Sequence, residues 1–275
     1  MRTNRTDPRQ GVTPWSRQRL QAALAGVAVL LFVLAASAAM LLVRTPAANQ
    51  EAGTQSAGTA RPTAESSDQV KDRIAAEPML SLDAEAATQP DPATEVADQI
   101  WIPEPLTGRG PAGLPVFGHT SEGAVAQLAA IDQAVLEAMS IPVARDVHTA
   151  WVLPGGPTFN EWDLTVNVAA FLRGGRQGAT KDLTTIVTAT PAGGLVKGAH
   201  GPDWAVACVL LDVRASIRAD YRMGWGHCHR MQWTDGRWQV APGAQPAKAP
   251  SAWPGSKSAL AAGWSAWSPV EGSGR

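Results

Sequence analysis

The sequence predicts an α+β domain, in which helices pack on a curved antiparallel sheet, behind a single N-terminal transmembrane helix and a disordered stalk. Three observations predict this organisation. An uncharged run of 22 residues lies near the N-terminus, a polar segment without aromatic residues follows it, and ten of the eleven Trp lie beyond that segment. In the last part, segments with helical periodicity precede β-branched runs, and helices followed by strands are typical of α+β domains.

Residues 22–43 are expected to form the membrane helix, because at about 1.5 Å per residue they can cross the ~30 Å hydrocarbon core. Residues 1–21 hold five Arg and one Asp, so we expect them to form a basic cytoplasmic segment with the C-terminal domain outside the cell. A cleaved signal peptide is the alternative, since residues 36–38 (Ala-Ser-Ala) suit cleavage. The apolar run continues to Val43, which favours an uncleaved anchor and a single-pass protein of the cell membrane.

Residues 44–105 are expected to form a disordered linker. Positions 44–100 hold four basic and ten acidic residues and no aromatic one. So few large apolar side chains cannot offset the entropy lost on ordering the chain. Short helices near Gln69–Ala76 or Met79–Ala87 are the structured alternative within this segment.

Residues 106–270 are expected to form the extracytoplasmic domain, which begins with helices. The stretch His119–Ser140 repeats apolar residues every three or four positions and has hydroxyl side chains that can cap its start. Ala144–Trp151 and Asn160–Arg173 are the next predicted helices, and two glycines at 174–175 end the second of them.

The strands follow residue 182. Leu183–Thr190 is rich in β-branched residues, while Asp203–Ile217 and Tyr221–Thr234 are long extended runs. Asp235-Gly236 is a strong hairpin signal that pairs Trp238–Val240 back onto the preceding strand. Helices on one face of this sheet would leave a concave side.

The two cysteines are expected to form a disulfide. A hairpin centred near residue 218 pairs residues whose numbers sum to 436, which sets Cys208 opposite Cys228. Facing positions of an antiparallel pair can bring Cβ atoms within disulfide distance, and an extracytoplasmic compartment permits oxidation. Two buried free thiols are the alternative.

Four Trp of the predicted sheet form a candidate binding surface for a helix, a peptide or a glycan. Strand parity places three of them on one face of the sheet and Trp204 on the other. The alternative interpretation is that all four are packed in the core. The four residues are Trp204, Trp225, Trp233 and Trp238.

Metal binding and catalysis have weak signals. His227 and His229 share a strand face and need a carboxylate to make a metal site, but the predicted register puts Asp212 and Asp220 on the cysteine face. No nucleophile elbow or phosphate-binding loop is present in the sequence. We therefore expect no metal, no cofactor and no enzymatic activity. In the alternative, an isomerase-like activity would depend on an acid inside the roll, either Asp203 or Asp212.

The order of anchor, tether, helices and long strands closing on the residues DGRWQVAPG at 235–243 resembles the cone-shaped roll of nuclear-transport-factor-2-like and cystatin-like domains. Conjugation and type IV secretion machines use anchored domains of this kind as scaffold subunits. Three segments also resemble actinobacterial membrane proteins carried on mobile elements: Gly118–Val125, Gly201–Trp204 and Trp233–Trp238. The resemblance spans roughly residues 113–267 and implies a fold and a setting, because its motifs are structural.

These observations together predict a membrane-anchored scaffold or assembly protein that binds protein partners in the cell envelope, in conjugative transfer or type IV secretion. A net charge of −1 argues against nucleic-acid binding. The first alternative is an extracytoplasmic ligand-binding or isomerase- or hydrolase-like module with a pocket in the roll, and the second is binding of cell-wall glycan. The oligomeric state, a homo-oligomer included, stays open.

Overall fold

The computed structural model describes residues 65–217 and 219–270. The predicted cytoplasmic segment, the predicted transmembrane helix and the start of the predicted linker lie outside the described residues. Across 65–217 and 219–270, no helix has the length and apolar character needed to cross a membrane.

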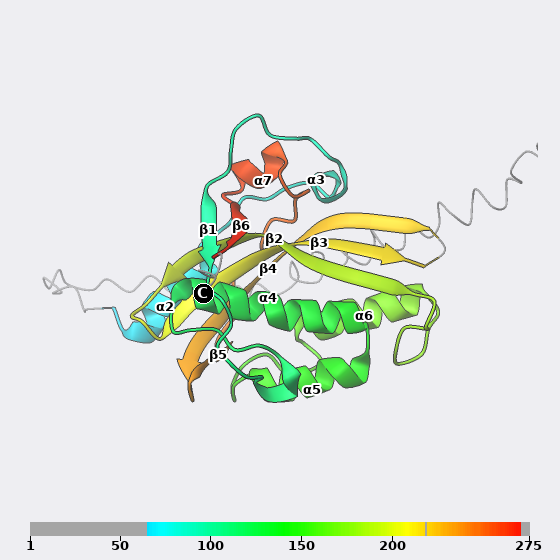
Figure 1. The fold of residues 1–275 in the computed structure, drawn as a ribbon. Coiled ribbons are helices and arrows are strands. Elements are labelled where there is room, and N and C mark those ends of the chain that lie inside the picture. Colours follow the sequence, from blue (N-terminus) through cyan, green and yellow to red (C-terminus); the bar gives the residue numbers. More distant parts are fainter. Residues whose placement is uncertain (1–64, 218, 271–275) are drawn as a thin grey trace, which may run out of the picture. The chain divides into compact units, whose positions relative to one another are not determined.

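A curled sheet of six strands, in the order β1-β6-β2-β3-β4-β5, is the framework of the domain (Figure 1). All neighbouring strands are antiparallel except β1 and β6, which run parallel. The sheet is curled into a half-barrel. This confirms the predicted α+β class, in which helices pack on a curved antiparallel sheet. The strands are β1 (Gln99–Ile102), β2 (Ile186–Ala199), β3 (Trp204–Ser216), β4 (Asp220–Thr234), β5 (Arg237–Val240) and β6 (Ser265–Pro269).

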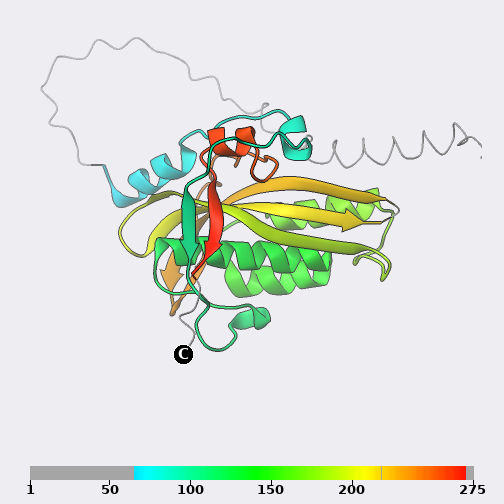
Figure 2. The same ribbon diagram turned by 45° about the horizontal axis from the view of Figure 1, so that its top comes forward.

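Helices cover both faces of the sheet (Figure 2). The three longest helices of the predicted helical region lie on one face, which we call the helix face: α4 (Ser121–Ala138), α5 (Ile141–Trp151) and α6 (Asp163–Gly174). The opposite face, which we call the disulfide face, is covered by short helices from both ends of the described chain: α2 (Ser67–Ala76), α3 (Glu85–Thr88) and α7 (Lys257–Ala261). A single turn of 3-10 helix, Pro111–Gly113, precedes α4.

Helix α4 forms because its sequence satisfies both its ends and one long apolar stripe. The Thr120 hydroxyl accepts a hydrogen bond from the Gly123 amide at 3.0 Å, which caps the first turn. Met139 ends the helix in a left-handed conformation with φ of 39°. Leu128 and Val135 are fully buried against the sheet, as the predicted periodicity requires.

The register of the β3–β4 hairpin is the predicted one. Cys208 pairs with Cys228, and Trp233 of β4 pairs with Trp238 of β5 across the tight turn. Side chains alternate between the two faces of a strand, so odd-numbered residues of β3 and β4 point to the helix face and even-numbered residues to the disulfide face.

Residues 65–105 belong to the folded domain, which is a correction to the predicted disordered linker. Helix α2 starts with a capping box in which Ser66 and Gln69 bond each other's backbone. Further on, β1 joins the edge of the sheet beside β6, which comes from the other end of the described chain. In the structure the domain therefore starts at least 40 residues before the predicted position 106.

For residues 65–105 the linker prediction is wrong because their few apolar side chains are concentrated where they can cover the sheet. Ile74, Met79 and Leu82 pack on the disulfide face together with the buried Ala75. Two buried or half-buried cations hold α2 in place. Lys197 Nζ donates to the carbonyl of Ala75 at 2.7 Å, at the negative end of the helix. On strand β4, a second contact joins Arg230 to Asp72 at 2.7 Å.

Candidate functional site

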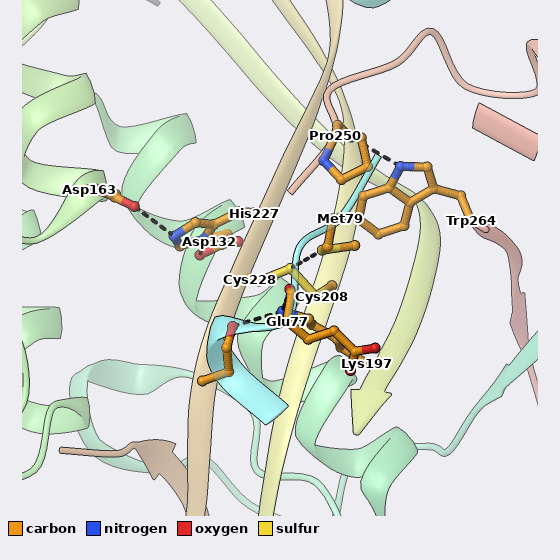
Figure 3. Close-up of a disulfide and its surroundings, with 11 residues drawn as sticks. Glu77, Met79, Asp132, Asp163, Lys197, Cys208, His227, Cys228, Pro250 and Trp264 are labelled. Carbon is orange, nitrogen blue, oxygen red and sulfur yellow. Dashed lines mark hydrogen bonds and ion pairs between the residues drawn. A yellow bond between two sulfur atoms is a disulfide. The ribbon is translucent and has the colours of Figure 1, made fainter. Parts of the chain in front are cut away.

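The cysteine pair lies where the sequence predicts it. The two Sγ atoms of Cys208 and Cys228 are 1.97 Å apart and their Cα atoms are 4.1 Å apart, so the pair is at disulfide distance. The pair is buried on the disulfide face, beside Met79 and near Trp264 (Figure 3). It joins the neighbouring strands β3 and β4 near the middle of their ladder.

The four predicted Trp do not form one binding surface, and the alternative of core packing is correct for three of them. Trp204, Trp225 and Trp238 expose only 2%, 8% and 1% of their surface, while Trp233 is half-buried. As parity predicted, Trp204 lies on the disulfide face and the other three on the helix face. They are buried because both faces of this sheet carry a covering layer.

A buried acid–base pair lies between α4 and β4 on the helix face. His227 Nδ1 is 2.9 Å from Asp132 Oδ2 and 3.0 Å from Oδ1, and the two side chains are 4% and 0% exposed. The ring of His227 stacks on Trp225 with a centroid distance of 4.8 Å. A carboxylate therefore contacts the first of the two predicted histidines, and it comes from helix α4, whereas the predicted candidates Asp212 and Asp220 lie on strands.

Charge on this pair follows from its surroundings. Burial opposes protonation of the His227 ring, but the charge of Asp132, its hydrogen bond and the charge of Asp163 outweigh burial and raise the pKa of His227. Burial also raises the pKa of Asp132, which the His227 contact only partly offsets. Both groups favour holding a proton, so the pair retains its shared proton above the ordinary pKa range of a histidine.

His229 has the opposite character. Burial, and next the charge of His227, set the pKa of His229 well below its usual range. Trp162 Nε1 donates to His229 Nε2 at 3.2 Å, so that nitrogen carries no proton. The two histidine rings meet edge to face at 4.8 Å, so a histidine with a raised pKa lies beside one with a lowered pKa.

The second nitrogen of His227 points towards the start of α6. His227 Nε2 is 3.9 Å from Asp163 Oδ2, and Asp163 is 57% exposed. Figure 3 shows both carboxylates beside the His227 ring. Among the described residues, His227 Nε2 is buried and has no hydrogen-bond partner.

The other predicted acids lie elsewhere. Asp203 pairs with His119 at 2.7 Å, and the His119 ring stacks on Trp233 at 4.4 Å, which brings together the three segments named for their resemblance to mobile-element proteins. Asp212 bonds two arginines on the disulfide face, Arg222 and Arg214. No group of three or more metal-ligating side chains occurs within 65–217 and 219–270.

A second candidate feature is the free edge of the sheet at β1. The carbonyls of Asp98 and Ile102 accept hydrogen bonds from the β6 side, so by alternation the backbone groups of Gln99 and Trp101 face away from the sheet. No described backbone group bonds them. The side chain of Trp101 is 59% exposed at this edge.

The structure thus defines an α+β domain in which helices pack on a curled, mostly antiparallel half-barrel sheet, with a central cysteine pair and a buried Asp–His pair. Comparisons with protein-family models, curated proteins and solved structures find no match to this chain.

Proposed function

We propose that this chain is a membrane-anchored scaffold whose extracytoplasmic domain binds protein partners at the free edge of β1. The uncharged span at 22–43 and the arginines before it support the anchor. The buried pair of Cys208 and Cys228 suits an oxidising compartment. Conjugative transfer or type IV secretion is the proposed setting, and its support is the resemblance alone.

The edge of β1 carries the proposal. Exposed edge strands normally hold charged residues, proline or a bulge that blocks pairing with other chains. Residues 99–102 read Gln-Ile-Trp-Ile and contain none of these. Tryptophan is the residue type most enriched at the energetic centres of interfaces. An edge strand with open backbone groups and an exposed Trp101 suits the addition of a strand from a partner.

The proposal is tested by crosslinking in cells. A photoreactive amino acid in place of Trp101 is expected to form a covalent adduct with another envelope protein. Leu183 is the matched control, because it is apolar, fully exposed and lies before β2. An adduct at position 101 and none at 183 is the expected result, and a full-length chain that gives no adduct at position 101 contradicts the proposal.

A ligand-binding or isomerase-like module is the second candidate, and the buried nitrogen of His227 favours it. Asp132 bonds one ring nitrogen, and the other has no described hydrogen-bond partner. This is the arrangement of a histidine oriented to exchange a proton with a bound molecule. This candidate uses Asp132 instead of the predicted Asp203 or Asp212.

Chemical modification tests this candidate. If a pocket reaches His227 Nε2, diethylpyrocarbonate is expected to modify His227 in the folded protein at a rate comparable with that of the more exposed His200. The comparison is made by peptide mass spectrometry at a pH above the range in which His227 is protonated. Complete protection of His227 while His200 reacts would show a closed structural pair.

A further inference from the structure

We infer that the partner segment accepted by β1 is basic: an extended stretch of another protein in which Lys or Arg residues flank apolar ones. This inference rests on the proposed function, since it specifies the chemistry of the partner at the same edge. It is carried by the charge around β1, by the positions of two carboxylates at the ends of the strand, and by the cost of self-pairing.

The chain around β1 is uniformly acidic. Residues 78–108 contain six acidic residues and no Lys or Arg, although the whole protein has nearly equal numbers of each sign. All six are exposed. In the described ranges, one of them forms an ion pair, that of Asp91 with Lys257 at 3.0 Å, and the other five form none: Asp83, Glu85, Glu95, Asp98 and Glu104.

Two of these carboxylates bracket the strand itself. Asp98 directly precedes β1, and Glu104 follows its end by two residues. A strand laid along β1 therefore passes a carboxylate at each end and open backbone groups between them. Trp101 lies within this stretch and can pack on an apolar residue of the added strand, while basic residues at its ends meet Asp98 and Glu104. Such opposite charges speed encounter and fix the register of the added strand.

The same charges disfavour a second copy of this chain as the occupant. Antiparallel pairing of two β1 strands would bring two sets of Glu95, Asp98 and Glu104 to one junction. Like charges facing each other across an interface cost free energy and suppress the wrong partner. The free edge is therefore open to a basic strand and closed to its own copy by repulsion.

The test uses the full-length chain in cells with the photoreactive residue at position 101, and it sequences the crosslinked peptide by mass spectrometry. The expected peptide comes from another protein and carries Lys or Arg on both sides of the attachment point. Replacing both Asp98→Asn and Glu104→Gln is expected to lower the yield of this adduct about fivefold, in line with the loss of two exposed charge pairs. The control variant Asp146→Asn with Asp235→Asn removes two exposed charges away from β1 and is expected to leave the yield unchanged.

Each outcome separates this inference from the proposed function. A crosslinked peptide without basic residues, or a yield that the D98N/E104Q change does not alter, overturns the inference and leaves edge binding standing. A peptide from this same chain overturns it in favour of self-association. Absence of any adduct at position 101 removes the proposed function itself. Formation of the Cys208–Cys228 disulfide, seen on non-reducing gels, reports that each variant has folded.

Discussion

Replacing Gly224 by alanine is expected to destabilise the domain by about 3 kcal/mol or more, at the upper end of the range for overpacked cores. A Cβ atom at this position would lie 1.7 Å from the backbone oxygen of Ala252. The segment that precedes α7 crosses β4 directly over Gly224 and, again, over Gly226, where a Cβ would lie 2.4 Å from the Pro250 oxygen. Because backbone atoms occupy both spaces, no side-chain rotation can relieve the contact.

The measurement is the free energy of unfolding in urea, read from the extrapolated transition. Gly118→Ala is the matched control, because no atom lies within 4 Å of its built Cβ and its φ is ordinary. We expect that control to stay within about 0.5 kcal/mol of the parent protein. A Gly224→Ala protein as stable as the control would mean that the 249–254 segment does not cross β4 at this point.

Replacing Asp132 by alanine is expected to cost about 3–5 kcal/mol, because it leaves His227 buried without its opposite charge. The same change at Asp163, which is 57% exposed and 3.9 Å from the ring, is the control and is expected to cost less than about 1 kcal/mol. Urea unfolding of both variants checks the difference. Equal costs at the two positions would contradict the assignment of Asp132 as the principal partner of His227.

The pH dependence of stability adds a second signature of this cluster. The pKa of His227 is raised in the folded state. Its contribution to folding stability is therefore fully present below the unfolded pKa of 6.5 and is lost as the pH rises through the folded pKa. The pKa of His229 is lowered, so below pH 6.5 the unfolded chain binds a proton that the folded ring refuses, and stability falls. The two histidines therefore place a stability maximum near pH 6.5.

Asp132→Asn separates the two limbs of this profile. Without the carboxylate, the pKa of His227 is no longer raised, and the decline of stability above the maximum is expected to disappear while the acid limb from His229 remains. Unfolding free energies measured over the range from about pH 5 to about pH 8 give both limbs, because each pKa unit corresponds to about 1.4 kcal/mol. An unchanged alkaline limb in the variant would assign that limb to other groups.

Local patterns were sufficient for the helices and the central hairpin. Apolar periodicity placed α4 within two residues of its observed ends. A hairpin centred near residue 218 predicted the pairing of Cys208 with Cys228, and the Asp-Gly turn predicted that of Trp233 with Trp238. These features depend on neighbours in sequence or on a period of two along a strand, and both can be read from the residues themselves.

The candidate site was only half predicted. His227 and His229 were identified from their shared strand face, but Asp132 stood within the apolar stripe of a helix, at a position where a charge conflicts with the pattern. That conflict is the signal that identifies it, because a charge in a buried stripe needs a buried partner. The partner lies 95 residues away, and no local rule connects the two.

The amino-acid sequence alone was enough to establish the basic, uncharged and acidic segments, the order of helices and strands, and the facing cysteines. Each of these follows from composition or from the regular spacing of residues along a helix or a strand. Packing alone decided that 65–105 joins the domain, that most of the sheet Trp are core residues, and that β1 is a free edge. The physical reason is that burial depends on what covers a residue. For this sheet the cover comes from both ends of the described chain, which no segment reveals in isolation.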